Sequence, residues 1–528
     1  MSTNTMIDLA AKPQIHHDEG ESIGTAPADR SPHYEPTTRY MVVFSVWIGM
    51  FGWLANFDQA FGGIVLVMQP FNKSFGTCVT SPAADGTPTE TCSTTALQQS
   101  LMQLSVLFMS GGGLLAGLFG DMLGRRRSLQ LGCLIIAVSA GGMMGTQGSF
   151  TNFLVCKCIS GVGIGVLAST APTYGSESVA PGKRGLLMGL YNVGLASGNV
   201  VAAAVCVGSS RFSSDWSWRM PIACQIPPAI ILALGAFFAP ESPRWLLTKD
   251  RRDEAARSFA KFSQQDVNSQ NVAEQVEAVV CHIEMERQLE QETSFRQLFR
   301  GLDLKRTHVA VLVLLGNALT GVQFVIPYTA LFLSQIGISN PYTLNVAVSS
   351  AILAGCLPGA FLCEYLGRRL CLLGGYSVMG ASMLIFAVVA SVLSQSSTTA
   401  QNVCVAILCL WAFTFGATSG PTAWVSSVEM HAIRLRTIGQ AYAVILYEIF
   451  SFGSAFWTPY MLNAEYGNMG TNVGYFYFGI TIVIIILTFL FVPETAKLSL
   501  EQVDEYFLGG EPAWKTSMAK NKRIAATG

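Results

Sequence analysis

Charged residues are scarce in this sequence: only 12% of its 528 residues are Asp, Glu, Lys or Arg, about half the share of a soluble globular protein. Several long stretches have none, namely residues 185–210, 220–240, 308–363 and 370–428. A run of roughly 20 apolar residues is long enough to cross a bilayer as a helix. The scarcity of charge therefore excludes a soluble globular protein and predicts an integral membrane protein.

Features of several other protein classes are also missing. The net charge is −1 and there is no basic patch with interleaved aromatic residues, so no nucleic-acid partner is expected. The sequence has no nucleophile elbow, phosphate loop or cluster of metal ligands, which argues against an enzyme, a cofactor or a metal site. Residues 1–38 lack the order of a cleaved signal peptide, and their polarity predicts a disordered tail.

Apolar stretches of the length of a membrane helix occur twelve times. Since no cleaved leader is expected, the first of them is predicted to serve as the insertion signal. The fold class is therefore an all-α membrane protein with twelve transmembrane helices, at residues 41–69, 97–119, 129–148, 151–174, 185–207, 219–239, 308–334, 343–363, 370–393, 402–427, 437–462 and 471–492.

Lysine and arginine cluster in every second connection between these spans. They stand in GRRR, GKR, GRR and RLR after spans two, four, eight and ten, and the long segment Glu241–Arg306 after span six holds 23 of the 65 charged residues. Basic residues stay on the cytoplasmic side, so both termini are expected there and the 71–96 loop outside. The predicted organisation is a cytoplasmic tail (1–38), a six-helix bundle (39–239), a cytoplasmic helical linker (240–307), a second six-helix bundle (308–492) and a cytoplasmic tail (493–528).

The external loop holds two further candidates. Most of the 13 cysteines lie in apolar spans, where cysteine acts as a small hydrophobe. Cys78 and Cys92 instead share the 71–96 loop, and an oxidising exterior would let them form a disulfide. Asn72 begins an NKS glycosylation sequon in the same loop, close to the membrane.

The two halves of the chain repeat each other in register. GDMLGRRR at 120–127 returns as CEYLGRRL at 363–370, and PESPRWL at 240–246 is echoed by PETAKLS at 493–499. Glu177 precedes Arg184 by seven residues, as Glu429 precedes Arg436. Such recurrence is difficult to obtain by chance, and it predicts two related bundles that rock about a site between them.

These motifs, together with PTYGSESVAPGKRG (172–185) and GPTAWVSSVEMHAIRLR (420–436), resemble the sugar porter family of the major facilitator superfamily, in a divergent fungal form, over about residues 40–505. The resemblance implies two bundles that open alternately to each side. It also implies that acids and arginines at the bundle edges form a salt-bridged cytoplasmic gate, although topology anchoring alone would also account for the arginines. The implied gate residues are Asp121, Arg125, Arg126, Glu177, Arg184, Glu364, Arg368, Arg369, Glu429 and Arg436.

Three ionisable residues, Asp58, Lys157 and Glu448, lie deep inside apolar spans. A charge at the bilayer centre costs at least about 2.5 kcal/mol, so each marks a candidate functional site. Asp58 and Lys157 stand where proton-coupled sugar porters carry an aspartate and an arginine, which implies proton coupling, with a static ion pair in a facilitator as the alternative. Glu448 is interpreted as a second proton site, an acceptor for substrate hydroxyls or a protonated structural carboxyl.

The resemblance also implies a substrate pocket, and here the sequence departs from the family pattern. Sugar porters show Gln-Gln-x-x-Gly-x-Asn in span seven, whereas this chain has NALTGVQ at 317–323. Amides remain, and each can both donate to and accept from a sugar hydroxyl. The implied substrate-binding residues are Asn192, Asn317, Gln323, Tyr328, Trp424 and Glu448.

The sequence therefore predicts a secondary active transporter in the plasma membrane, acting as a monomer. Its expected partners are the lipid bilayer, protons and a small molecule, a sugar or a related polyol or glycoside. Three alternatives stay open: a transporter or exporter of a non-sugar organic metabolite, an uncoupled facilitator, and a nutrient sensor that does not transport.

Overall fold

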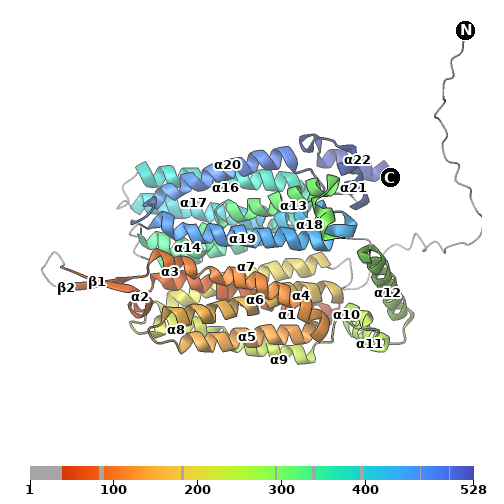
Figure 1. Ribbon diagram of the computed structural model, residues 1–528, viewed down its shortest axis with the longest axis horizontal. Coiled ribbons are helices and arrows are strands. Elements are labelled where there is room, and N and C mark those ends of the chain that lie inside the picture. Colours follow the sequence, from red (N-terminus) through yellow and green to blue (C-terminus); the bar gives the residue numbers. More distant parts are fainter. Residues whose placement is uncertain are drawn as a thin grey trace, which may run out of the picture. The chain divides into compact units, whose positions relative to one another are not determined.

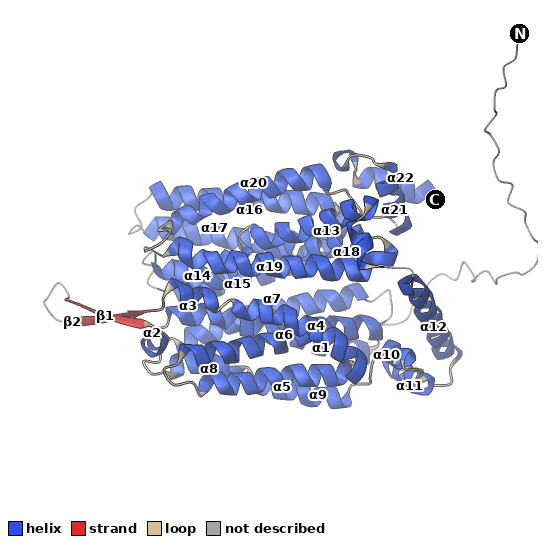
Figure 2. Ribbon diagram, in the orientation of Figure 1, coloured by secondary structure: helices blue, strands red, loops and turns tan. Residues whose placement is uncertain are grey.

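The computed structural model describes residues 38–82, 88–179, 184–291, 294–335, 340–392, 398–463, 465–498 and 500–527. The predicted N-terminal tail lies outside these residues except for Thr38. Helices dominate the described chain, and its two strands form one small hairpin, as Figure 2 shows. The all-α prediction is therefore confirmed.

The first half of the chain begins with a capped helix. The hydroxyl of Thr38 accepts a hydrogen bond from the backbone N–H of Met41 at 3.1 Å, which fixes the start of α1. The elements of this half are α1 Arg39–Ile64, η1 Val65–Val67, α2 Gln69–Phe75, β1 Thr77–Pro82, β2 Pro88–Ser93, α3 Ala96–Leu101, α4 Leu104–Leu123, α5 Arg125–Met144, α6 Phe150–Ser178, α7 Arg184–Ser209, α8 Trp216–Cys224 and α9 Ile226–Phe238.

The segment after α9 is helical, and it has a small apolar core of its own. Its elements are α10 Pro243–Thr248, α11 Arg252–Ser263, α12 Gln270–Gln291 and η3 Phe295–Phe299. Residues of α10, α11 and α12, including Trp245, Ala255 and Val276, form this core. The segment ends earlier than predicted, because the next helix begins at Gly301 rather than at 308. Asp303 in its first turn suits the positive end of a helix, so the helix includes charged residues that the apolar pattern assigned to the linker.

The second half repeats the helix order of the first. Predicted spans seven and ten are each broken into two helices, at Thr320–Gly321 and at Thr418. The elements are α13 Gly301–Leu319, α14 Val322–Gln335, α15 Pro341–Leu366, α16 Arg368–Val392, α17 Thr398–Ala417, α18 Ser419–Met430, η4 Ile433–Leu435, α19 Arg436–Leu462, η5 Gly470–Asn472, α20 Val473–Phe491, α21 Leu500–Gly509, η6 Ala513–Lys515 and α22 Met518–Thr527.

Eleven helical stretches of the described chain are long and apolar enough to cross a membrane. The predicted span 437–462 is the exception: α19 has the length, 27 residues, but a more polar sequence. It nevertheless packs along α13 and α14 inside the second bundle. Counting α19 gives the twelve predicted spans, arranged as two six-helix bundles.

The two bundles meet along a few helices. α7 packs against α15, α1 against α14 and α3 against α19. The approach of α1 to α14 is so close that a Cβ atom added to Gly63 would lie 1.8 Å from the carbonyl oxygen of Pro327. Only glycine fits at such a backbone contact.

The two ends of the helices differ. Figure 1 shows the β1–β2 hairpin at one end, which we call the hairpin end, and α10–α12 with α21 and α22 at the other, the insert end. Two hydrogen bonds join the bundles beside the hairpin: Ser100 Oγ donates to the carbonyl of Phe456 at 2.7 Å, and the Tyr328 hydroxyl donates to the carbonyl of Gln99 at 3.3 Å. The bundles are thus held together at the hairpin end.

Candidate functional site: two charge networks, a buried ion pair and polar side chains around α19

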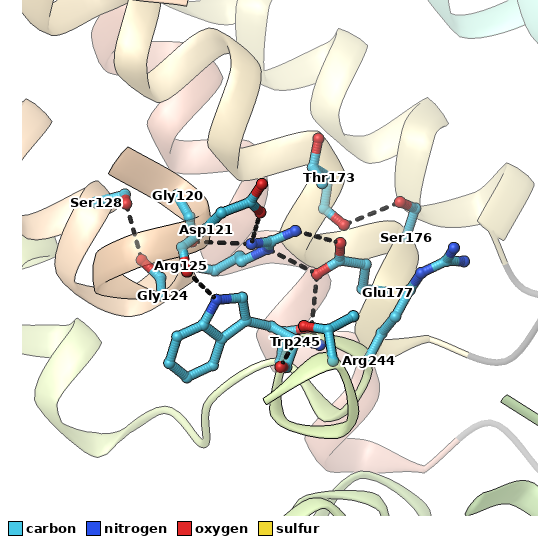
Figure 3. A network of polar contacts seen from close by, with 12 residues as sticks. Gly120, Asp121, Gly124, Arg125, Ser128, Thr173, Ser176, Glu177, Arg244 and Trp245 are labelled. Carbon is cyan, nitrogen blue, oxygen red and sulfur yellow. Dashed lines mark hydrogen bonds and ion pairs between the residues drawn. The ribbon is translucent and has the colours of Figure 1, made fainter. Parts of the chain in front are cut away.

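Arg125 is the centre of a polar network at the insert end of the first bundle (Figure 3). Its guanidinium forms a bidentate pair with Glu177 of α6, with Nε–Oε2 and Nη2–Oε1 distances of 2.9 and 2.8 Å. The third nitrogen donates to Gly120 O at 2.9 Å and to Asp121 at 3.2 Å. Because Arg125 and Glu177 are only 15% and 10% exposed, their pair is stronger than an open surface bridge.

Arg368 is the centre of the matching network in the second bundle. Its Nη2 lies 3.1 Å from both Glu429 of α18 and Glu364 of α15. A hydroxyl completes each network: Thr495 Oγ1 donates to Glu429 at 2.6 Å, as Ser242 Oγ donates to Glu177 at 2.6 Å. The repeats seen in the sequence therefore correspond to one arrangement built twice.

Two further acids belong to these networks, and the sequence prediction missed them. Glu241 accepts from the backbone N–H of Arg125 at 3.0 Å, and Glu494 accepts from that of Arg368 at 2.9 Å. A carboxylate in this position caps the first turn of α5 or α16 and faces the positive helix end. Burial raises the pKa of Glu241, although the backbone donors favour its charged form. The repeated PES and PET motifs were the signal that could have identified both residues.

The glycines before these arginines make the caps possible. Gly124 and Gly367 have φ values of +85° and +90°, a region in which side chains are strained. A Cβ atom would also lie 2.6 Å from Glu241 at the first position and 2.4 Å from Glu494 at the second. The glycine of each GRR motif therefore makes room for the capping carboxylate.

The remaining predicted gate arginines bind backbone oxygens. Arg126 donates to the carbonyls of Ala236 and Phe237, both at 2.8 Å, and Arg369 to that of Phe489 at 2.7 Å. Arg184 donates to the Ser176 carbonyl at 3.0 Å rather than sharing the carboxylate of Glu177, and Arg436 begins α19. Each partner named for Arg125, Arg126, Arg184, Arg368 and Arg369 belongs to the same bundle as its arginine or to the segment that directly follows that bundle. A salt bridge from one bundle to the other is not among these contacts.

Asp58 and Lys157 meet inside the first bundle, as the sequence led us to expect. Lys157 Nζ of α6 lies 2.7 Å from Asp58 Oδ2 of α1 and 2.6 Å from the Asp58 carbonyl oxygen. It also lies 4.4 Å from the centroid of the Phe61 ring. The side chains are 2% and 0% exposed, and Asp58 Oδ1 has no hydrogen-bond partner in the described part of the chain. A buried charge is strongly destabilising once its partner is removed.

Several of the predicted pocket residues converge on α19. The Gln323 amide of α14 donates to the Ser451 hydroxyl, and the Trp424 ring of α18 packs edge-on against Tyr447 with centroids 5.1 Å apart. Glu448 lies between these α19 positions and is 7% exposed. Within the described residues its carboxyl makes no hydrogen bond or ion pair. An amide, an aromatic face and an unpaired carboxyl are thus available around one helix.

The other predicted pocket residues make structural contacts. Asn317 is buried and donates to the Ser419 carbonyl at 3.1 Å, so it holds α13 to the start of α18. Tyr328 is completely buried and bonds across to α3 at the hairpin end. Asn192 is half-buried on α7, the helix that faces α15.

The loop after α1 contains a disulfide between Cys78 and Cys92, which are directly opposite each other on β1 and β2. The sequon asparagine, Asn72, lies within α2 and is only 8% exposed. Because a glycan needs an accessible amide, this burial argues against glycosylation at Asn72.

Comparisons with known proteins agree with this architecture. Residues 44–507 match the sequence model of the family described as Sugar (and other) transporter. The chain is 27% identical to the probable glucose transporter rco-3 of Neurospora crassa, over 89% of this chain and 80% of that protein. It is also 27% identical to hexose transporter 2 of Kluyveromyces lactis, over 95% of this chain and 88% of that protein.

Solved structures show the same fold. The xylose transporter XylE from E. coli, in a partially occluded inward-open conformation, is similar with a TM-score of 0.70 at 18% identity, covering 87% of this chain and 99% of that one. A second structure of XylE, described as an MFS (major facilitator superfamily) protein, matches with a TM-score of 0.69. The chain belongs to the sugar (and other) transporter family and is a multi-pass membrane transporter with the major facilitator fold.

Proposed function

We propose that this protein carries a sugar across the plasma membrane by alternating access and couples that movement to protons through Asp58 and Lys157. The observation that supports coupling is the buried ion pair between them, 2.7 Å long, in a bundle whose membrane helices otherwise carry no charge at this depth. A buried ion pair that served only to pack two helices would add little stability to an apolar bundle, since hydrophobic residues of similar size are often at least as stabilising.

The chemistry of coupling follows from the position of the pair on two helices. While α1 and α6 stay together, the ammonium of Lys157 lies 2.7 Å from the carboxylate of Asp58. If substrate binding separates these helices, Asp58 becomes a buried carboxylate without a cation, and protonation becomes favourable. Return of α6 then expels the proton. In this scheme the unpartnered Oδ1 of Asp58 is the oxygen that receives the proton.

A sugar substrate is supported by the polar groups around α19. Gln323 offers an amide that donates and accepts, and the face of Trp424 suits the C–H surface of a sugar ring. The Glu448 carboxyl makes no hydrogen bond or ion pair within the described residues. Its oxygens are therefore available to accept a hydrogen bond from a sugar hydroxyl. The relatives are described as glucose and hexose transporters, and XylE as a proton:xylose symporter, which agrees with this class of substrate.

The proposed orientation places the insert end in the cytoplasm. Arg125, Arg126, Arg368 and Arg369 all lie at that end, and basic residues remain cytoplasmic. The hairpin end with its disulfide is then outside, where oxidation is favoured. Because the hydrogen bonds that Ser100 and Tyr328 make between the bundles lie at the hairpin end, the structure fits a state that is closed to the outside.

The test is uptake of labelled sugars into proteoliposomes with and without a proton gradient, comparing wild type with Asp58→Asn. The variant keeps the shape of the side chain and removes its titration, so we expect it to lose accumulation against a gradient while retaining exchange. Glu254→Gln is the matched control, because Glu254 is also a carboxylate paired with a cation, Arg251, but is 45% exposed and lies on α11, outside the bundles. Normal accumulation by Asp58→Asn would exclude Asp58 as the proton carrier.

An uncoupled facilitator is the second candidate, and one contact favours it. Lys157 is held by the backbone carbonyl of Asp58 at 2.6 Å as well as by the carboxylate, so the pair has a structural anchor that does not depend on protonation. A wild-type protein that equilibrates sugar without moving protons would establish this alternative.

A further inference from the structure

A cavity of about 350 Å³ lies at the hairpin end, between the two bundles. From the first bundle it is lined by the residues after α1 and by the connection between α7 and α8. From the second bundle it is lined by Tyr342, at the start of α15. The residues that carry the argument are Arg211, Ser213, Ser217 and Tyr342. None of them belongs to the charge networks, the buried ion pair or the pocket around α19.

The polar groups of this cavity favour an anion. Arg211 is exposed and forms no ion pair within the described residues, whereas its neighbour Arg219 is neutralised by Asp215 at 3.3 Å. The carboxylate of Asp215 also accepts a hydrogen bond from the Ser74 hydroxyl. Ser217 is 1% exposed, and its hydroxyl has no hydrogen-bond partner in the described part of the chain. A free guanidinium and a buried, unsatisfied hydroxyl in one cavity match the hydrogen-bonding needs of a phosphate.

The cavity lies at the depth of lipid headgroups. The membrane helices that border it end at Val67 and Ser209 or begin at Trp216 and Pro341, so its lining residues stand within a few positions of the ends of the spans. Phe212 and Trp216 beside it are 48% and 55% exposed. Exposed aromatic rings next to a basic residue are typical of the membrane–water interface.

We propose that this cavity binds the phosphate group of a membrane phospholipid, with Arg211 as the charged contact and Ser217 as the buried donor. The exposed rings of Phe212 and Trp216 provide an apolar surface for the acyl chains of the lipid. A soluble phosphate would not need such a surface. Because the walls come from both bundles, the bound headgroup favours the conformation in which the bundles meet at the hairpin end. This conformational effect, but not the binding itself, rests on the alternating-access function proposed above.

The binding test is native mass spectrometry of the detergent-purified protein titrated with dioleoylphosphatidylglycerol. Arg211→Gln should raise the apparent Kd about fivefold, since one basic residue near a lipid surface contributes about 1 kcal/mol. Ser217→Ala should weaken binding as well. Lys73→Gln is the matched control, because it removes an exposed positive charge near the same end of the molecule that does not line the cavity. Equal losses in Lys73→Gln and Arg211→Gln would overturn the site.

A second arm distinguishes the source of the phosphate. The protein is placed in nanodiscs of digalactosyldiacylglycerol, a lipid without phosphate, and its thermal unfolding is followed. Adding dioleoylphosphatidylglycerol should raise the midpoint for wild type, and by less for Arg211→Gln at the same lipid content. If millimolar inorganic phosphate alone gives the same increase, the ligand is soluble phosphate and the lipid assignment is wrong. Neither arm requires transport, so both remain informative if the transport proposal fails.

Discussion

At the scale of single residues, Gln323 links the broken seventh span to the proposed substrate pocket around α19. Its amide already donates to Ser451, so a sugar hydroxyl would join an existing hydrogen bond rather than create an isolated one. We expect Gln323→Ala to raise the half-saturating sugar concentration about tenfold, equivalent to about 1.4 kcal/mol. Uptake kinetics measure this half-saturating concentration. Gln130→Ala is the control, because Gln130 donates to the Ala233 carbonyl within the first bundle; an equal effect of both variants would contradict the pocket role.

His431 is a second residue with a measurable consequence. It lies directly after α18 and is 2% exposed. Burial, together with the positive charges of Arg306 and Arg436, lowers its pKa from 6.5 to about 4. The folded protein therefore holds this histidine neutral, while the unfolded chain takes up its proton below about pH 6.5.

Stability should then fall with acidity over that interval, since the unfolded state binds the extra proton between pH 6.5 and about 4. The contribution at about pH 5 is about 2 kcal/mol of lost stability. Thermal unfolding of wild type and His431→Gln at several pH values measures it. The difference between them should be constant above pH 6.5 and should shift in favour of the variant below it; parallel curves would show that folding does not lower the pKa of His431.

At the scale of elements, the carboxylate caps determine where α5 and α16 begin. Glu494 is 4% exposed and accepts from the backbone of Arg368 at 2.9 Å. Removing it leaves buried N–H groups without partners, so Glu494→Ala should lower the free energy of unfolding by about 1–3 kcal/mol. Glu364→Ala, at a 55% exposed acid of the same network, should cost less than about 1 kcal/mol. Equal thermal shifts in the two variants would argue against the cap.

The elements that were predicted from sequence are those that composition alone determines. Twelve spans followed from stretches without charge. The Asp58–Lys157 pair followed from two isolated charges at positions that match the sugar porter pattern. The start of α13 was missed because Asp303 suits a helix N-terminus while it interrupts an apolar pattern. The roles of Glu241 and Glu494 were missed because a cap across more than a hundred residues depends on tertiary contacts. Trp424 and Gln323 both contact α19, the helix that carries Glu448. Tyr328 and Asn317 instead make hydrogen bonds that connect helices to one another.

At the scale of the whole molecule, the contact between α1 and α14 controls closure at the hairpin end. A Cβ atom on Gly63 would overlap the Pro327 carbonyl at 1.8 Å, so Gly63→Ala should keep the bundles apart there and shift the population toward a state open at that end. Spin labels on α1 and α14 and double electron–electron resonance measure the separation. Gly111→Ala is the control, because its Cβ would meet nothing within 4 Å. An unchanged distance in Gly63→Ala would show that closure does not depend on this contact.

The self-contained networks also have a consequence for synthesis on the ribosome. The partners named for Arg125, from Gly120 to Glu241, all precede residue 243, so the first bundle can complete these polar contacts while the second is still unmade. The backbone N–H of Arg368 cannot be capped until Glu494 has been synthesised. At about 5–20 residues per second, the start of α16 remains uncapped for several seconds after it enters the membrane. The start of α5 waits for Glu241 over a nearly equal stretch of chain, so each bundle needs protection from misassembly until its own capping acid has been made.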